Sequence, residues 1–375
     1  MKKISSFFVL IGLMLPCTEV LVAQTIQEDL QGIWRARVVS IESESKTTIP
    51  GTETEALIQN IQAELLEGEK IGQIVRVEND FLSLEVGDKF FLNYLITLDG
   101  NEIYTVADAD RRGALIFFMI LFAAVILFFG GKQGLRSLLA LFGSLFIISY
   151  ALIPSLTLGF PPVLTSVTIA VVILFLGIFL THGWNRESLV AFLGTCSAVL
   201  ITGILATFAV DASKLSGFAS DESVFLNMQT GGTLDFAGLL LGGIIIGILG
   251  VLDDIAVTQA AVVRELFYTD KNLSRKEAYT RAIRVGKEHV GALVNTLALA
   301  YAGTSLPLLL LFYKSEASAG FLLNSELFAT EIIRTIIGSI GLVLTVPITT
   351  GLAVWLLKAH STSPSNHTHS HGHAH

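Results

Sequence analysis

The stretch Gly247–Glu265, with the sequence GILGVLDDIAVTQAAVVRE, decides the fold and raises the main question about function. It places two adjacent carboxylates, Asp253 and Asp254, inside an apolar segment that runs from Phe236 to Val263. No other ionisable side chain lies in that segment. Because a charge at membrane depth is costly, such residues usually face a bundle interior and carry a function or a buried partner.

The composition of the whole chain is that of a membrane protein. Of its 375 residues, 52% are hydrophobic and only 15% are charged, and the mean hydropathy is +0.67. The formal net charge of −8 argues against a nucleic-acid partner. The two cysteines, Cys17 and Cys196, support neither a disulfide framework nor a zinc site.

Residues 1–23 have the pattern of a secretory signal peptide. Lys2 and Lys3 precede a short apolar run, and Ala23 offers a small residue for cleavage before Gln24. An uncleaved membrane anchor is the alternative interpretation. We expect the segment that follows to be exported.

Residues 24–112 contain no stretch long enough to span a membrane, and they alternate with the period of two that is typical of β-strands. Turn signals such as Asp99-Gly100 separate expected strands at 32–43, 55–66, 71–78, 89–98 and 102–107. The alternative interpretation is that residues 52–66 form a helix. Five short strands predict a small exported β-rich domain, a barrel of OB-like or SH3-like type, that recognises a substrate or partner.

Seven apolar stretches of membrane-spanning length follow this domain. They are 113–130, 135–153, 162–181, 189–210, 236–263, 289–313 and 331–357. The predicted fold class is therefore an all-α bundle of seven transmembrane helices preceded by the β-rich domain. Pro307 and Pro347 are expected to kink their helices.

The distribution of Lys and Arg predicts the orientation of the spans. These residues concentrate in the loops 131–136, 182–188 and 264–288, which the positive-inside rule places in the cytoplasm together with the C-terminus. Arg111 and Arg112, on the exported side of the first span, are the exception to this rule.

The two carboxylates point to ion or proton coupling. On a helix, Asp254 shares a stripe with Thr258 and Glu265, whereas Asp253 aligns with Arg264. Two neighbouring carboxylates cannot both ionise cheaply in a low dielectric, so the pair is expected to titrate as a unit. We predict coupling through Asp254, with Asp253 and Thr258 assisting. The alternatives are a structural polar lock, in which each Asp bonds to another span, and simple exposure at the membrane interface.

Polar side chains that can support the pair lie on the same span and on the next one. They are Gln259, Glu265, His289, Asn295 and Thr296. His289 alternatively marks only the interfacial end of its span. Glycines precede the pair at Gly238, Gly242, Gly243, Gly247 and Gly250. Their spacing predicts close helix packing, and the alternative is a thin wall beside a substrate path.

The C-terminal tail, residues 358–375, is expected to be disordered and alternates histidine with small residues. Its five alternating histidines are His367, His369, His371, His373 and His375. They predict weak transition-metal binding, and a solvated low-complexity end is the alternative. No other cofactor is expected. Phosphate loops, nucleophile elbows and HExxH motifs are lacking, so we expect no enzyme activity.

Five segments occur together in a specific order. They are Gln59–Asn79 (QNIQAELLEGEKIGQIVRVEN), Tyr104–Arg111, Gly250–Thr258 (GVLDDIAVT), Asn295–Pro307 (NTLALAYAGTSLP) and the segment from Glu331 to Leu342. Together they resemble the YibE/F family of bacterial multi-pass membrane proteins over nearly all of residues 25–357. The resemblance implies a multi-pass protein of the bacterial cytoplasmic membrane, and it makes Asp254 the family's acidic position. Asp253 departs from that pattern, and the family supplies no biochemical activity to transfer.

The leading functional hypothesis is a polytopic transporter or translocation accessory coupled to protons or cations. Its expected partners are membrane lipid and an unknown substrate or envelope protein, and the chain is a candidate for oligomer formation. The second hypothesis is a non-transporting membrane scaffold whose exported domain docks an envelope partner. An intramembrane enzyme ranks third, because no nucleophile–base pairing is visible in the sequence.

Overall fold

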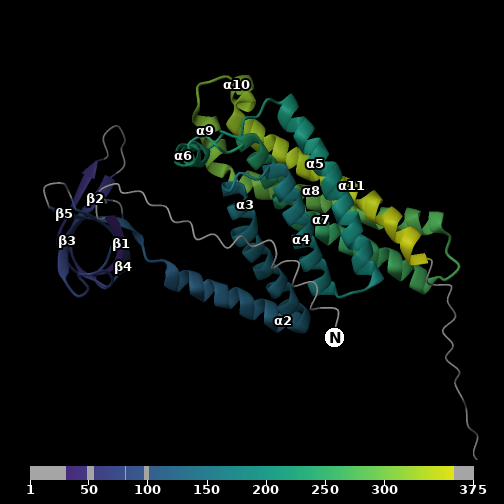
Figure 1. The fold of residues 1–375 in the computed structure, drawn as a ribbon, viewed down its shortest axis with the longest axis horizontal. Helices are drawn as coiled ribbons and strands as arrows, with labels where there is room; N and C mark the ends of the chain where they lie inside the picture. The colour runs from purple at the N-terminus through teal and green to yellow at the C-terminus, as the bar shows by residue number, and fades with distance from the viewer. Residues whose placement is uncertain (1–30, 49–54, 81, 97–100, 359–375) are drawn as a thin grey trace, which may run out of the picture. The chain divides into compact units, whose positions relative to one another are not determined.

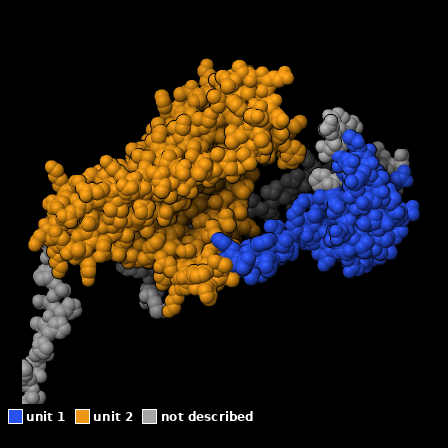
Figure 2. Space-filling view, turned by 180° about the vertical axis from the view of Figure 1, so that it is seen from behind, with its two compact units in different colours: residues 1–122 blue, residues 123–375 orange. Residues whose placement is uncertain are grey.

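A computed structural model describes residues 31–48, 55–80, 82–96 and 101–358. The chain divides into two compact units, residues 1–122 and 123–375 (Figure 2). The signal peptide predicted at 1–23 and the five histidines of the tail lie outside the described residues. Each unit is therefore considered by itself.

The first unit contains a closed five-stranded barrel (Figure 1). Its strands are β1 (Gln31–Thr48), β2 (Glu55–Leu65), β3 (Ile74–Asn79), β4 (Lys89–Ile96) and β5 (Glu102–Ala109). The order around the barrel is β1-β2-β3-β5-β4, and β3 pairs with β5 in parallel whereas the other neighbours are antiparallel. The predicted small β-rich barrel is confirmed. The helical alternative for residues 52–66 is wrong, because Glu55–Leu65 pairs with strands on both sides.

Alternation along the strands builds the barrel core. Ile61, Leu65, Phe90 and Leu92 are fully buried, and charged neighbours point outward. Two amides are buried among these apolar side chains. Asn79 Nδ2 donates to Gln59 Oε1 at 2.9 Å, and Gln59 Nε2 donates to the Leu84 carbonyl at 3.0 Å. The amide pair therefore ties β2 and β3 to the loop that leads into β4.

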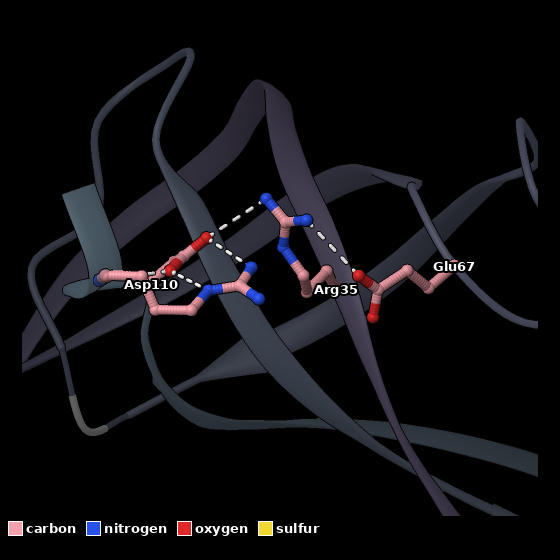
Figure 3. A network of polar contacts seen from close by, with 4 residues as sticks. Arg35, Glu67 and Asp110 are labelled. Atoms are coloured by element: carbon pink, nitrogen blue, oxygen red, sulfur yellow. Dashed lines mark hydrogen bonds and ion pairs between the residues drawn. The ribbon is translucent and has the colours of Figure 1, made fainter. Parts of the chain in front are cut away.

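A network of ion pairs lies where the barrel leads into the first long helix (Figure 3). Asp110 accepts hydrogen bonds from Arg112 Nε at 2.8 Å and Nη2 at 2.9 Å, and it pairs with Arg35 at 3.2 Å. Arg35 also pairs with Glu67 at 3.2 Å, and Arg111 pairs with Asp108 at 2.7 Å. The two arginines that break the positive-inside rule are thus each matched by an aspartate.

The described residues after the barrel are mostly helical. Its elements are α2 (Arg112–Ile147), the π-helix η1 (Ile148–Leu152), α3 (Ile153–Thr157), α4 (Pro162–His182), α5 (Arg186–Ala212), α6 (Asp221–Gln229), α7 (Phe236–Thr269), α8 (Arg275–Thr304), α9 (Leu306–Lys314), α10 (Ala319–Asn324) and α11 (Glu326–Lys358). Among the described residues, five helices are long and apolar enough to cross a membrane. There are six if α8 and α9, which meet at a bend of 66°, form one broken span.

The long helix α2 reverses direction at Gly131. Its φ of 52° and ψ of −131° are not helical, and a positive φ is a conformation that glycine adopts without steric cost. A Cβ atom added at Gly134 would lie 2.4 Å from the carbonyl oxygen of Ile126. A straight helix would separate these two residues by about 12 Å along its axis. The two legs of α2 therefore form a hairpin.

Helix α7 is the centre of the second unit, where it packs against α4, α5, α8 and α11 (Figure 1). Ile244, Ile248, Leu252 and Leu342 are fully buried at these contacts. Small residues bring neighbouring backbones close together. A Cβ added at Gly341 of α11 would lie 2.4 Å from Thr202 Oγ1 of α5, and one at Gly194 of α5 would lie 2.3 Å from Thr349 Oγ1 of α11.

The amide pair of the barrel supplies a stability test. Asn79→Ala removes one of the two donors to Gln59 Oε1 and both partners of the Leu82 backbone, so we expect a loss of about 1–3 kcal/mol in unfolding free energy. Urea denaturation of residues 24–112, followed by the fluorescence of Trp34, measures this loss. Asn60→Ala is the control, because Asn60 bonds only Ser43 on the exposed surface, and we expect a change within about 0.5 kcal/mol. Equal losses in both variants would contradict the role of the buried pair.

The junction supplies a pH test. Hydrogen bonding to Arg112, and then the charge of Arg35, hold the pKa of the Asp110 carboxyl below its ordinary value. A carboxyl whose pKa is lower in the folded state stabilises that state above the unfolded pKa of about 4, and this contribution fades as acidification protonates the group. The stability advantage of wild type over Asp110→Asn should therefore be largest near neutral pH and shrink below about pH 4. An advantage that stays constant on acidification in the same urea assay would refute this assignment.

Candidate functional site

The two carboxylates occupy the middle of a continuous helix. Helix α7 begins behind Asp235, whose Oδ1 accepts the backbone N–H of Gly238 at 2.9 Å. Its first ionisable residues after that cap are Asp253 and Asp254. Consecutive helical residues point about 100° apart. Asp253 and Asp254 therefore meet different surroundings although they are neighbours in sequence.

Asp253 points into the contact between α7 and α4. Its Oδ1 atom is buried and has no hydrogen-bond partner. Its Oδ2 atom lies 3.9 Å from the position that a Cβ of Gly177 would occupy. Because Gly177 has no side chain, it offers this carboxylate space but no donor. A buried polar atom without a partner is uncommon and calls for a functional explanation.

Asp254 lies on a different, exposed face of α7. Three glycines, Gly243, Gly247 and Gly250, share this face because they precede it at helical spacing. Space is open around Gly243 and Gly250, where an added Cβ would meet no atom within 4 Å. At Gly247 the added Cβ would lie 3.5 Å from the hydroxyl of Tyr301 on α8. We call Gly243, Gly247, Gly250 and Asp254 the glycine face.

The remaining predicted packing glycines lie on the α4 side. A Cβ at Gly242 would lie 2.3 Å from Ser166 Oγ, and one at Gly238 would lie 3.2 Å from Pro162 Cβ. The glycines were predicted either to allow close helix packing or to form a thin wall, and they differ in their surroundings. Gly238 and Gly242 permit close packing, whereas Gly243 and Gly250 leave a bare backbone surface.

Gln259, and neither carboxylate, forms a buried hydrogen bond to another helix. Its side chain is 1% exposed, and its Oε1 accepts the Thr350 hydroxyl of α11 at 2.9 Å. A Cβ at Gly286 of α8 would lie 2.8 Å from Gln259 Nε2. One amide therefore bonds α7 to α11 and packs closely against the backbone of α8.

The other predicted polar residues are more dispersed. Thr258 is half-buried, whereas Glu265, His289, Asn295 and Thr296 are exposed. The Thr296 hydroxyl donates to the carbonyl of Ala292 in its own helix at 2.9 Å. Within the described part of the chain, the structure gives none of these side chains a hydrogen bond to either carboxylate.

Two residues next to the carboxylates and the glycine face, Gly177 and Tyr301, were not predicted from the sequence. Gly177 faces Asp253 across the α4–α7 contact, and nothing in the sequence distinguishes it from other glycines of the spans. Tyr301 faces Gly247, and a signal for it was present, because Tyr301 is the only aromatic residue in the segment Asn295–Pro307. Among the described residues no cluster of His, Cys, Asp and Glu is suited to hold a metal ion.

Comparison with protein families gives one match. A family model described as YibE/F-like protein matches residues 118–359. The matched range includes almost all of α2 and every later helix, and hence both carboxylates. Comparisons with curated proteins and with solved structures give no match.

The surroundings of Asp253 and Gln259 predict opposite effects of mutation on stability. Because Asp253 has a buried oxygen without a partner, Asp253→Asn should leave the thermal unfolding midpoint unchanged or raise it. Gln259→Ala removes a satisfied buried amide and should cost about 1–3 kcal/mol. The measurement is thermal unfolding of the full chain in detergent. If Asp253→Asn lowers the midpoint as much as Gln259→Ala does, Asp253 is a structural lock as well.

Proposed function

This chain belongs to the YibE/F-like family of membrane proteins, and we propose that it is a transporter or translocation accessory coupled to protons or cations through Asp253 and Asp254. The observation that carries the proposal is the carboxylate oxygen of Asp253, which is buried in an apolar helix contact without a partner. A group that only stabilised the fold would have a donor, as Gln259 has. A proton or a cation would supply the partner that the surroundings do not give to this oxygen of Asp253.

The two carboxylates suit different steps of a coupling cycle. Asp254 lies on the exposed glycine face, where an ion or proton can reach it. One carboxylate oxygen of the half-buried Asp253 is buried at the contact with α4, where a charge is expensive unless it is neutralised. Because the groups are adjacent, ionisation of one disfavours ionisation of the other. Transfer between an exposed and a half-buried carboxylate would link a helix movement to protonation.

The proposal includes a topology of seven spans, with the barrel exported and the C-terminus in the cytoplasm. It is supported by the reversal of α2 at Gly131, which divides one long apolar helix into two legs. It is also supported by the bent pair α8 and α9, which counts as one broken span. The distribution of Lys and Arg among the loops supports the orientation.

Proton movement in membrane vesicles tests the coupling. Everted vesicles that contain the full chain are energised to hold a pH gradient, and a soluble cell extract serves as the source of substrate. We expect the wild type to dissipate the gradient faster than vesicles without the protein, and we expect Asp253→Asn and Asp254→Asn to abolish this difference. Asp235→Asn is the matched control, because it makes the same chemical change at the helix cap, where asparagine also serves. Two carboxylate variants that dissipate the gradient as wild type does would exclude the mechanism.

The scaffold hypothesis remains the second candidate, and the separate compact unit that contains the barrel favours it. In that case the barrel recruits an envelope protein and the helices only anchor it. Co-purification of a partner that survives Asp254→Asn but disappears on deletion of residues 25–110 would favour the scaffold. Loss of the partner only in the carboxylate variants would count against it.

A further inference from the structure

A polar pocket of about 180 Å³ lies in the second unit where α4 ends and α5 begins. Helix α2 contributes Gln133 and Arg136, α4 contributes His182, α5 contributes Asn185 and Ser188, and α7 contributes Arg264. Most of the side chains that line it are polar, whereas its position is at the end of apolar helices. The pocket is distinct from the two carboxylates, and the proposed function leaves it without a role.

The charge in this pocket is positive. Arg136 and Arg264 bring two guanidinium groups to it, and Glu187 is the single carboxylate among the lining residues. Glu187 is already engaged in an ion pair with Arg264. Arg136 forms no ion pair with any described residue. A guanidinium group at a pocket wall is a strong and geometrically specific donor to phosphate oxygens.

The backbone adds further donors. Helix α5 is 27 residues long and begins at the pocket, where the side chain of Asn185 accepts the backbone N–H of Ser188 at 2.7 Å. The positive end of the dipole of this helix favours a negative charge at this position.

A buried hydroxyl gives an independent indication of a ligand. Ser188 lines the pocket, is 2% exposed, and its Oγ atom has no hydrogen-bond partner. Buried hydroxyl groups in proteins are nearly always satisfied. The Ser188 hydroxyl, which lines the same pocket as Arg136 and Arg264, is therefore a donor that lacks its acceptor.

We propose that this pocket binds a phosphate group, carried either by free phosphate or by the headgroup of an anionic phospholipid. Arg136, the Ser188 hydroxyl and the first turn of α5 would surround its oxygens. A phosphate in this position bridges α2 to α4, α5 and α7. The ligand would therefore hold the α2 hairpin against the bundle.

Two binding measurements on the purified full chain in uncharged detergent test the proposal. In the first, inorganic phosphate is titrated by calorimetry. In the second, the thermal unfolding midpoint is compared after addition of phosphatidylglycerol or of phosphatidylcholine. Arg136→Gln should weaken binding about tenfold and Ser188→Ala about threefold, as expected for one charged and one neutral donor. Lys132→Gln is the control, because it removes a charge from the same turn of α2 but does not line the pocket.

The outcomes separate the sources of the phosphate. Loss of binding in Arg136→Gln and Ser188→Ala in the phosphate titration supports the site and shows that the phosphate group alone suffices. Loss only in the phosphatidylglycerol experiment supports the site and assigns it to a lipid headgroup. The proposal is overturned if neither ligand binds the wild type, or if Lys132→Gln weakens binding as much as Arg136→Gln. Unchanged unfolding midpoints of the variants without ligand exclude misfolding as the cause.

Discussion

The bundle depends on close approach of helix backbones, because lipid tails give apolar helices little reason to leave lipid for one another. Glycines and small hydroxyl residues create this approach between α5 and α11, at Gly341 with Thr202 and at Gly194 with Thr349, and between α7 and α4, at Gly242 with Ser166. Some of the threonine hydroxyls in the bundle are satisfied by their own helix. Thr202 donates to the Ala198 carbonyl at 2.7 Å, and Thr345 donates to the Gly341 carbonyl at 2.8 Å.

This manner of packing has a consequence for buried charge. A threonine hydroxyl has one hydrogen, and once that hydrogen is given to the preceding turn only acceptor lone pairs remain. An ionised carboxylate is itself only an acceptor. Hydroxyls such as those of Thr202 and Thr345 are therefore poor partners for an ionised carboxylate. Gln259 avoids this difficulty because Thr350 gives its hydrogen to the amide. The contrast shows that the bundle can satisfy a polar side chain where the fold requires it.

Local sequence patterns predict much of this architecture. The five strands were placed within a few residues, because alternation and turn residues are local signals, and α4, α5 and α7 follow the hydropathy closely. Pro307 marks the bend between α8 and α9, since α9 begins at Leu306 after the 66° bend. The site was predicted less completely. The sequence favoured Asp254 as the coupling residue, but which aspartate is more buried depends on which helix covers each stripe of α7. That arrangement depends on contacts such as Asp253 with Gly177, which no local pattern encodes.

The glycine face lowers the stability of helix α7. At Gly243 and Gly250 a methyl group would meet no atom within 4 Å, and alanine would favour the helix by about 0.5–1 kcal/mol over glycine. Glycine at these two positions forgoes that gain and leaves the helix backbone beside Asp254 bare, so that whatever approaches this carboxylate from the open side meets main chain and no side chain.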